Sequence, residues 1–418
     1  MNYGFIIDNR KCIGCHACTV ACKSEHDVPL GVNRTWVKYV EKGQYPDTRR
    51  LFSVMRCNHC ADAPCVEICP VTALYTRDDG IVDFDPRRCI GCKGCMQACP
   101  YDALYMDPES KTAAKCNYCA HRVDIGLEPA CVNVCPEHAI ISGDMDNPKT
   151  EISRLLAREQ VTVRKAEKGT RPKLYYIEGD ESVLNPTSTD PSGSYMWNAQ
   201  STGVGHFAKY AEERISQADP IQMARQLAAA GTISDGHAEN EVLVPQGEDM
   251  AEIAENVKKE NIRRVYDTPG KGVLWGWEVT AYVWTKAIAA GVFLVPFLAM
   301  VFNWAPVTAS TQWMAAETGL LFLFLTTVLL VMDLDQPKRF LYVLLRPQWH
   351  SWLTLGGYAL TIYGGLLTLW CVATALDIEA LAGAVQGIAA LFAVITAVYT
   401  AFLFAQAKGR DFWQSPTL

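Results

Sequence analysis

The 418-residue chain lacks several patterns that would assign it to common functional classes. Its formal net charge is −7 and it has no basic stripe, so general nucleic-acid binding is not expected. It contains no glycine-rich dinucleotide loop after a strand, no P-loop, and no legible order of serine, histidine and aspartate. We therefore expect no substrate chemistry in this chain itself.

The chain also lacks an N-terminal export pattern. The start, MNYGFIIDNR, has no charged segment followed by an apolar stretch and a small-residue cleavage site. Nothing there directs the protein to an oxidising compartment, so a disulfide framework is not expected. Beyond Cys135 cysteine is almost absent: of 17 cysteines only Cys371 lies there, and we expect it to be buried as a small apolar side chain.

The other sixteen cysteines fall into four runs of four. Two runs read CxxCxxCxxxC, the bacterial ferredoxin spacing, and two are stretched variants of it. The runs are Cys12, Cys15, Cys18 and Cys22; Cys57, Cys60, Cys65 and Cys69; Cys89, Cys92, Cys95 and Cys99; and Cys116, Cys119, Cys131 and Cys135. Zinc is the alternative for any single CxxC pair. The triplet spacing and the prolines after three of the runs favour 4Fe-4S clusters.

A tandem repeat relates these runs. CIGCHACTVAC returns as CIGCKGCMQAC, and RCNHC at 56–60 returns as KCNYC at 115–119. The repeat indicates two linked two-cluster modules. In two-cluster ferredoxins the fourth cysteine of a run binds the other cluster, so we expect crossed ligand sets. The expected sets are Cys57, Cys60, Cys65 with Cys99; Cys89, Cys92, Cys95 with Cys69; Cys12, Cys15, Cys18 with Cys135; and Cys116, Cys119, Cys131 with Cys22.

Four histidines lie near these runs, at His16, His59, His121 and His138. Because sixteen cysteines already supply four complete sets, we expect the histidines to be surface groups or to tune the clusters through hydrogen bonds.

The chain divides into three parts by composition. Residues 1–172 hold the cysteine runs, residues 173–270 are polar and rich in turn-forming residues, and residues 271–418 are mainly apolar. Within the polar part, the spacing at 207–230 and 248–266 suits partial helices. A solvated tether is the equal alternative.

Four apolar runs in the last part are long enough to cross a membrane, at 279–302, 314–332, 352–376 and 381–405. Lysine and arginine precede the first span, follow the second and follow the fourth, whereas the loops between the first and second spans and between the third and fourth spans have neither. By the positive-inside rule both termini and the cysteine-rich domain are expected on the cytoplasmic side of an inner membrane. The predicted class is α+β, with tandem ferredoxin-like modules, a polar linker and an all-α four-helix bundle.

Ionisable groups inside spans are costly and mark candidate functional sites. Lys286 and Glu317 are the clearest, and Glu278, Tyr282 and Lys286 share one helical face by their four-residue spacing. That face is a candidate site for a quinone head group and for proton transfer. The alternative is structural pairing or snorkelling of Glu278 and Lys286.

With these motifs in hand, residues 1 to about 150 resemble the four-cluster electron-transfer subunit of dimethyl-sulfoxide and polysulfide reductase type molybdopterin oxidoreductases. DLDQPKRF at 333–340 and RPQWHSW at 346–352 are similar to the polysulfide-reductase (NrfD-like) membrane anchor. The resemblance implies electron transfer between quinone and a molybdopterin catalytic subunit through four 4Fe-4S clusters. Because such anchors usually have about eight spans, it also implies a further anchor subunit or a second copy.

Two other interpretations stay open at this point. The chain could be the linking subunit of a membrane formate dehydrogenase or hydrogenase, which keeps the clusters and changes the partner. It could also be a redox-inactive membrane scaffold stapled by zinc.

Overall fold

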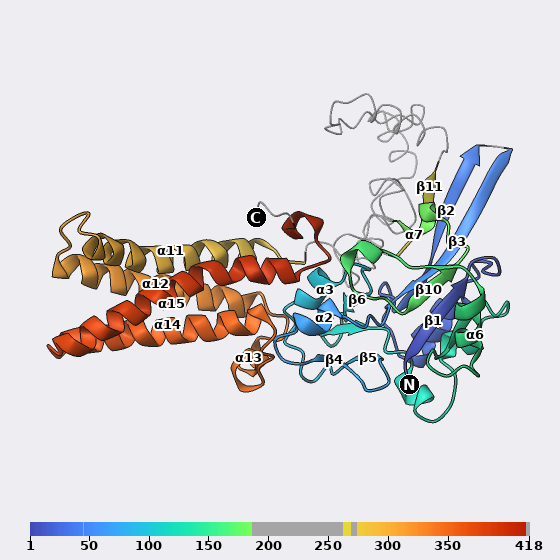
Figure 1. The fold of residues 1–418 in the computed structure, drawn as a ribbon, viewed down its shortest axis with the longest axis horizontal. Helices are drawn as coiled ribbons and strands as arrows, with labels where there is room; N and C mark the ends of the chain where they lie inside the picture. Colours follow the sequence, from blue (N-terminus) through green and yellow to red (C-terminus); the bar gives the residue numbers. More distant parts are fainter. Residues whose placement is uncertain (45, 186–261, 269–273, 415–418) are drawn as a thin grey trace, which may run out of the picture.

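The computed structural model describes residues 1–44, 46–185, 262–268 and 274–414. Figure 1 shows two unlike parts along the long axis: a bundle of long helices at one end and a region of strands and short helices at the other. The expected helices at 207–230, and 248–261 of the second stretch, lie outside the described residues.

The N-terminal strand is central to a four-stranded sheet of order β8-β1-β10-β9. The strands are β1 (Tyr3–Asp8), β8 (Ile140–Asp144), β9 (Val161–Thr162) and β10 (Leu174–Ile177). β1 pairs parallel with β10 and antiparallel with β8. Phe5, Ile6 and Ile7 are buried in succession because the sheet is covered on both faces, one of them by α6 (Glu151–Arg158).

This sheet crosses the boundary expected at residue 172. β10 and α7 (Glu181–Leu184) follow that residue, and Leu174, Tyr176 and Val183 are buried in the same core as Phe5. The folded N-terminal part therefore extends to residue 185. The composition of the stretch after residue 172 is polar on average, so nothing in the sequence indicated the short strand β10. The partner of this strand, β1, lies at the other end of the domain in sequence.

A second sheet has the order β11-β2-β3 and consists of β2 (Thr35–Gln44), β3 (Asp47–Arg56) and β11 (Arg263–Tyr266). The end of the expected helix at 248–266 is thus a strand. Arg263 and Arg264 pair with Glu41 and Val40 of β2. The segment is too short for its own sequence to specify a strand, so this edge pairing determines its conformation.

Short helices and hairpins carry the cysteine runs. The hairpins are β4 (Leu74–Thr76) with β5 (Val82–Phe84), and β6 (Leu104–Met106) with β7 (Ala113–Lys115). The helices are α1 (Ala17–Glu25), α2 (Pro64–Glu67), α3 (Gly94–Ala98), α4 (Ala120–Val123) and α5 (Ala130–Asn133). Together with the first sheet they form the predicted α+β region.

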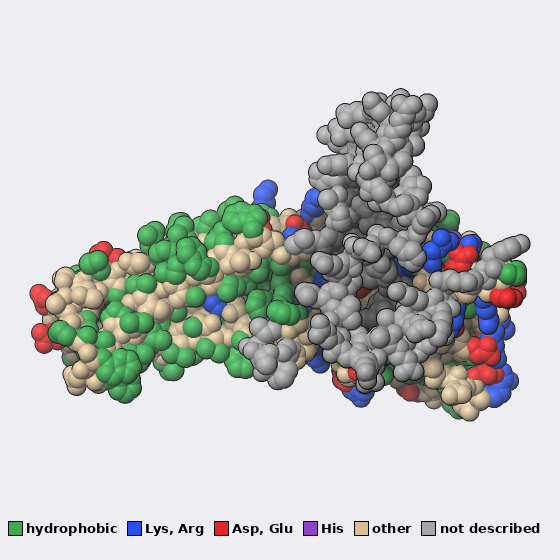
Figure 2. Space-filling view, turned by 90° about the horizontal axis from the view of Figure 1, so that it is seen from above, with side chains coloured by type: hydrophobic (Ala, Val, Ile, Leu, Met, Phe, Trp, Pro, Cys, Tyr) green, Lys and Arg blue, Asp and Glu red, His purple; other side chains and the backbone are tan. Residues whose placement is uncertain are grey.

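Four long helices follow, as predicted. They are α11 (Trp277–Val301), α12 (Ala309–Met332), α14 (Trp352–Ala375) and α15 (Glu379–Gln406), each apolar and long enough to span a membrane. Figure 2 shows an apolar surface over this part and charged side chains over the other end. The protein is therefore a multi-pass membrane protein, because such a surface is stable only in lipid.

Small residues allow the four helices to pack closely. Ala289, Ala390 and Ala393 are buried at the centre of the bundle with Tyr363 and Leu367. A short helix, α13 (Tyr342–Leu345), lies in the loop between α12 and α14, after a single 3-10 turn at Pro337–Arg339.

Candidate iron–sulfur and quinone sites

The cysteine loops wind through left-handed backbone conformations. Gly14 and Gly91 have φ of 70° and 74°, and His16 and Lys93, two residues later in each loop, have φ of 60° and 59°. A Cβ at Gly14 would lie 2.5 Å from the Phe52 ring, so both conformation and space require glycine. The equal angles in the two loops are the structural counterpart of the sequence repeat.

The structure brings the sixteen cysteines together in four groups. Three groups each line a cavity of their own. In the remaining group the thiol of Cys22 interacts electrostatically with those of Cys116, Cys131 and Cys119. We name them the proximal group (Cys69, Cys89, Cys92, Cys95), the second group (Cys57, Cys60, Cys65, Cys99), the third group (Cys22, Cys116, Cys119, Cys131) and the distal group (Cys12, Cys15, Cys18, Cys135).

The geometry of these groups suits 4Fe-4S clusters. A cubane takes one thiolate at each of its four irons, so its ligands surround the cluster. Four cysteines around a cavity therefore fit a 4Fe-4S cluster.

The buried sulfur atoms would carry thiolate charge only with a metal bound. Burial raises the pKa of the thiols of Cys18, Cys60 and Cys119, each to about 12. Such thiols lose their protons at neutral pH only to a bound metal. Backbone N–H groups are already directed at sulfur: Ala73 donates to Cys69 Sγ and Ala139 to Cys135 Sγ, each at 3.2 Å. These donors would stabilise thiolate charge.

The four histidines singled out in the sequence do not complete any group. His121 lies 2.7 Å from Glu25, His138 lies 3.0 Å from Glu151, and His16 packs edge-on against Tyr266. His59 is buried, and its Nδ1 accepts a hydrogen bond from the Val82 N–H at 3.2 Å. The sequence reasoning missed His26, whose Nε2 lies 3.2 Å from Cys119 Sγ, because it is distant from Cys119 in sequence.

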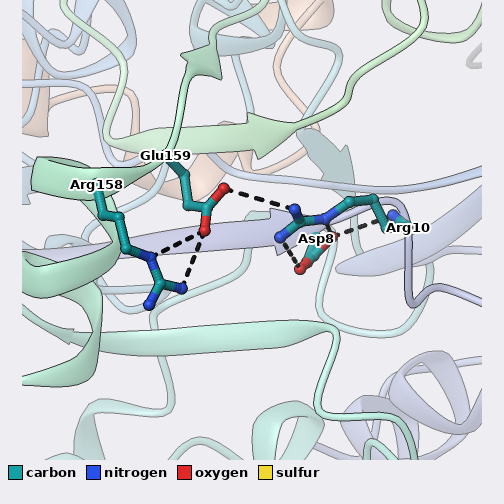
Figure 3. Close-up of polar contacts among 4 residues, drawn as sticks. All are labelled: Asp8, Arg10, Arg158 and Glu159. Carbon is teal, nitrogen blue, oxygen red and sulfur yellow. Dashed lines mark hydrogen bonds and ion pairs between the residues drawn. The ribbon is translucent and has the colours of Figure 1, made fainter.

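An ion pair between a buried aspartate and an exposed arginine fixes the entry to the loop of the distal group. Asp8 ends β1, and the Arg10 guanidinium donates to both of its carboxylate oxygens at 2.8 Å, with Glu159 and Arg158 beyond (Figure 3). Burial alone would raise the pKa of the Asp8 carboxyl, but the hydrogen bonds from Arg10 outweigh burial and lower it. The Asp8 N–H also donates to Ala139 O, which ties this loop to the Cys135 segment.

The proximal group is attached to the membrane helices. Trp275 Nε1 donates to Cys92 O and Arg339 Nη1 donates to Cys89 O, each at 3.0 Å. On the other side Ser351 Oγ donates to Ile68 O at 2.6 Å, and Thr354 Oγ1 donates to Pro70 O at 3.0 Å. Backbone carbonyl groups of the cysteines or next to them are thus held by the segment before α11, the loop before α14 and the first turn of α14.

A cavity of about 420 Å³ lies between the proximal group and the membrane helices. Cys92 and Trp275 line it at the cluster end, and Tyr282, Tyr399 and otherwise mostly apolar side chains line it along the bundle. Asp333, at the end of α12, is also in its wall, and burial raises the pKa of this carboxyl to about 6. A mostly apolar cavity with a few polar groups is the usual form of a ligand site.

The residues proposed from the sequence for a quinone site are only partly brought together. Tyr282 lines the cavity, and Lys286 lies one turn further on, with Nζ donating to Thr400 Oγ1 at 2.6 Å and placed 4.5 Å from the Tyr399 ring centre. Glu278 acts electrostatically on Asp333 without lining the cavity. Glu317 is exposed on α12 outside the cavity lining. From its place beside the loop after the second span, the sequence already offered Asp333 as a possible proton acceptor. Packing against the proximal group places it in the cavity wall.

Comparison with known proteins agrees with both parts of the structure. A family model described as a 4Fe-4S dicluster domain matches residues 48–145, and another of the same description matches residues 11–74. The family model described as polysulphide reductase, NrfD, matches residues 268–418. The protein is thus a membrane-anchored iron–sulfur protein that carries 4Fe-4S clusters.

Three relatives define its family more closely. The B component of tetrathionate reductase from Salmonella typhimurium is 43% identical over 188 residues, 44% of this chain and 75% of the relative. The B component of polysulfide reductase from Wolinella succinogenes is 44% identical over 180 residues, 42% of this chain and 93% of the relative. Protein NrfC of Escherichia coli is 42% identical over 181 residues, 42% of this chain and 81% of the relative. The protein belongs to this family of iron–sulfur electron-transfer subunits of membrane reductase complexes, here fused to an NrfD-type membrane domain.

Proposed function

We propose that the chain transfers electrons between membrane quinone and a molybdopterin catalytic subunit through four 4Fe-4S clusters. The series of cysteine groups carries this proposal. It starts at the membrane cavity with the proximal group and ends with the distal group, whose Cys15 is exposed. Each cluster supplies a one-electron carrier whose potential the surrounding protein sets.

The ligands that we propose are the sixteen grouped cysteines, in the crossed sets expected from the repeat. Interactions between neighbouring groups support the order of the series. Cys95 of the proximal group interacts electrostatically with Cys65 of the second group, and Cys131 of the third group interacts with Cys18 of the distal group. The second and third groups meet where Cys116 packs in the same core as Cys57.

The quinone site that we propose is the cavity beside Cys92. Its apolar walls suit a quinone ring and tail, and Tyr282 and Asp333 are the polar groups on which a head group would bind. Asp333 is poised to take up a proton, since its pKa of about 6 lies close to neutrality. Lys286 supports the wall through Tyr399 and Thr400.

The surface at the distal group suits a protein partner. Ile13 and Val20 flank Cys15 and Cys18 in sequence and are 55% and 65% exposed. Relatives bear the names of tetrathionate, polysulfide, dimethyl sulfoxide and arsenate reductase subunits. We propose a molybdopterin catalytic subunit that reduces or oxidises a sulfur compound, sulfoxide or similar oxyanion.

We also propose an arrangement in the inner membrane with the cluster domain on the cytoplasmic side. The loop between α12 and α14 carries Lys338, Arg339 and Arg346, whereas the loops at the other end of the bundle carry no lysine or arginine. A second copy or a further anchor subunit would enlarge the membrane domain. Residues between the two folded parts would act as a linker.

Metal analysis of the full chain, prepared anaerobically with its membrane, tests the cofactor proposal. We expect about sixteen irons and sixteen acid-labile sulfides per chain, which follows from four cubanes on sixteen cysteines. Zinc without sulfide would overturn the proposal.

A reduction assay in membranes tests the electron path. We expect a quinol analogue to reduce the clusters, and the single change Tyr282→Phe to slow this reduction without changing reduction by dithionite. Clusters that accept electrons from dithionite but never from quinol would contradict the quinone part.

A surface change tests the partner proposal. Val20→Asp places a charge in the exposed apolar surface near Cys15, so we expect loss of a co-purifying molybdopterin subunit with unchanged iron content. Ile125→Asp, at a similarly exposed apolar residue in the loop after α4, is the control. If both variants retain the partner equally, the surface at the distal group is not the binding site of the catalytic subunit.

A further inference from the structure

Arg56 is a completely buried arginine between cysteine groups. It ends β3, directly before Cys57, and is 0% exposed. Its guanidinium lies 4.3 Å from the centre of the Phe5 ring, which packs in one core with Cys18 and Cys131. None of its three side-chain nitrogen atoms has an oxygen or nitrogen hydrogen-bond partner among the described residues, and the Cys131 thiol acts on it as a sulfur acceptor.

The charge of Arg56 faces sulfur atoms. The acidic groups that act on its guanidinium are the thiols of Cys131 and Cys116 in the third group and of Cys18 in the distal group. No carboxylate in the described part of the chain shares it. A guanidinium does not deprotonate in proteins, and a buried charge without a counter-charge is strongly destabilising. A partner of negative charge is therefore needed at this position.

Lys115 is the counterpart of Arg56 in the repeat. It stands directly before Cys116, as Arg56 stands before Cys57, and it too is 0% exposed. Its Nζ donates to Val82 O and, at 2.8 Å, to Cys116 O. Its charge acts on Cys65, which belongs to the second group. Each cation thus acts on cysteines of the other repeat, and Arg56 also acts on Cys18 of its own repeat.

We propose that Arg56 and Lys115 are a crossed pair of buried cations that set the reduction potentials of the two inner clusters, Arg56 for the third group and Lys115 for the second. This inference rests on the proposed cluster ligands. Both are positioning residues that act on the clusters through space.

The physical reason is electrostatic. Four thiolates outweigh the positive charge of an iron–sulfur core, and reduction adds one more negative charge. In a low-dielectric interior a fixed cation stabilises the reduced form more than the oxidised form, which raises the potential. Because Arg56 acts on two thiols of the third group and one of the distal group, its effect should be larger at the third group.

A redox titration followed by electron paramagnetic resonance tests this role in the full chain in membranes. For Arg56→Gln we expect one cluster to become at least tenfold harder to reduce, which is 59 mV for a one-electron couple. Cys119→Ser identifies that signal, since an oxygen ligand alters the spectrum of its own cluster. Arg56→Lys keeps the charge, so most of the potential should return. Lys115→Gln should lower the reduction potential of a different cluster, seen as a different signal.

Arg88→Gln is the matched control. Arg88 also stands directly before a cysteine, Cys89, but it is exposed and paired with Asp85, so we expect less than a threefold change at every cluster. Unchanged potentials in both Arg56→Gln and Lys115→Gln at full iron content would overturn the crossed pair, and so would equal shifts at all clusters. If Arg56→Gln loses iron, the titrations of Lys115→Gln and Arg56→Lys test the crossed pair instead: an unchanged potential in Lys115→Gln would overturn it. A wild-type chain without iron would instead refute the cluster proposal itself.

Discussion

At the scale of single residues, the loop of the distal group depends on the carboxylate of Asp8. Its side chain is 4% exposed and bound on both oxygens by Arg10. We expect Asp8→Asn to lower the free energy of unfolding by about 1.5–3 kcal/mol, the usual contribution of hydrogen bonds to a charged group. Thermal unfolding of the anaerobic protein measures this, and Asp62→Asn, at the exposed pair with Arg171, should change it by less than about 1 kcal/mol.

The same pair predicts how stability depends on pH. Because the pKa of Asp8 is lower in the folded protein than in the unfolded chain, its contribution is present above the unfolded value, near 4. The contribution is lost as the pH falls through the lower folded value. Wild-type protein should therefore lose stability more steeply than Asp8→Asn below about pH 4. Parallel curves for the two proteins would show that Asp8 is not charged in the pair.

The carboxyl group of Asp333 predicts how cluster reduction by quinol depends on pH. Burial raises its pKa to about 6, so it becomes a proton acceptor as the pH rises through that value. We expect reduction of the clusters by a quinol analogue to accelerate between about pH 5 and 7 and then level off. In Asp333→Asn the rate should fall by about 10²-fold or more and lose this pH dependence. A pH profile unchanged in Asp333→Asn would exclude the carboxylate as the acceptor.

At the scale of elements, the packing of α14 on α15 depends on one glycine. A Cβ at Gly356 would overlap the Tyr399 ring, whereas a Cβ at Gly387 would meet nothing within 4 Å. We therefore expect Gly356→Ala to destabilise the bundle by about 1–3 kcal/mol and Gly387→Ala to leave it unchanged or more stable. Unfolding in detergent compares the two, and equal stability would show that Tyr399 moves freely.

Elements specified by long apolar runs were predictable, and those that depend on a distant partner were not. The four spans were confirmed, with ends that shift by up to five residues, because about twenty apolar residues specify a membrane helix locally. β10 and β11 were missed because each has only four residues and gains its stability from β1 or β2. Their sequences alone carry no such information.

At the scale of the whole molecule, Arg339 joins the membrane helices to the loop of the proximal group. Arg339 Nη1 donates to Pro86 O at 2.7 Å and to Cys89 O at 3.0 Å. Arg339→Ala leaves both carbonyl groups without this donor, at a cost of about 1–3 kcal/mol. We expect slower reduction by quinol and unchanged reduction by dithionite. Lys338→Ala, at the exposed neighbour, should behave as wild type, and equal rates in all three proteins would show that this contact does not limit transfer.

The sequence by itself determined the chemistry of the cluster region and the number of spans. Cysteine spacing and hydropathy are local properties of the sequence, so they can be interpreted without knowledge of the fold. The crossed assembly of the cysteine groups was predicted from the repeat, and the structure brings those cysteines together. Only the tertiary structure decided that the proximal group rests on the bundle, that Asp333 and Tyr282 share a cavity, and that Arg56 lies beside the third group. These depend on contacts between residues far apart in the chain, whose geometry no short pattern encodes.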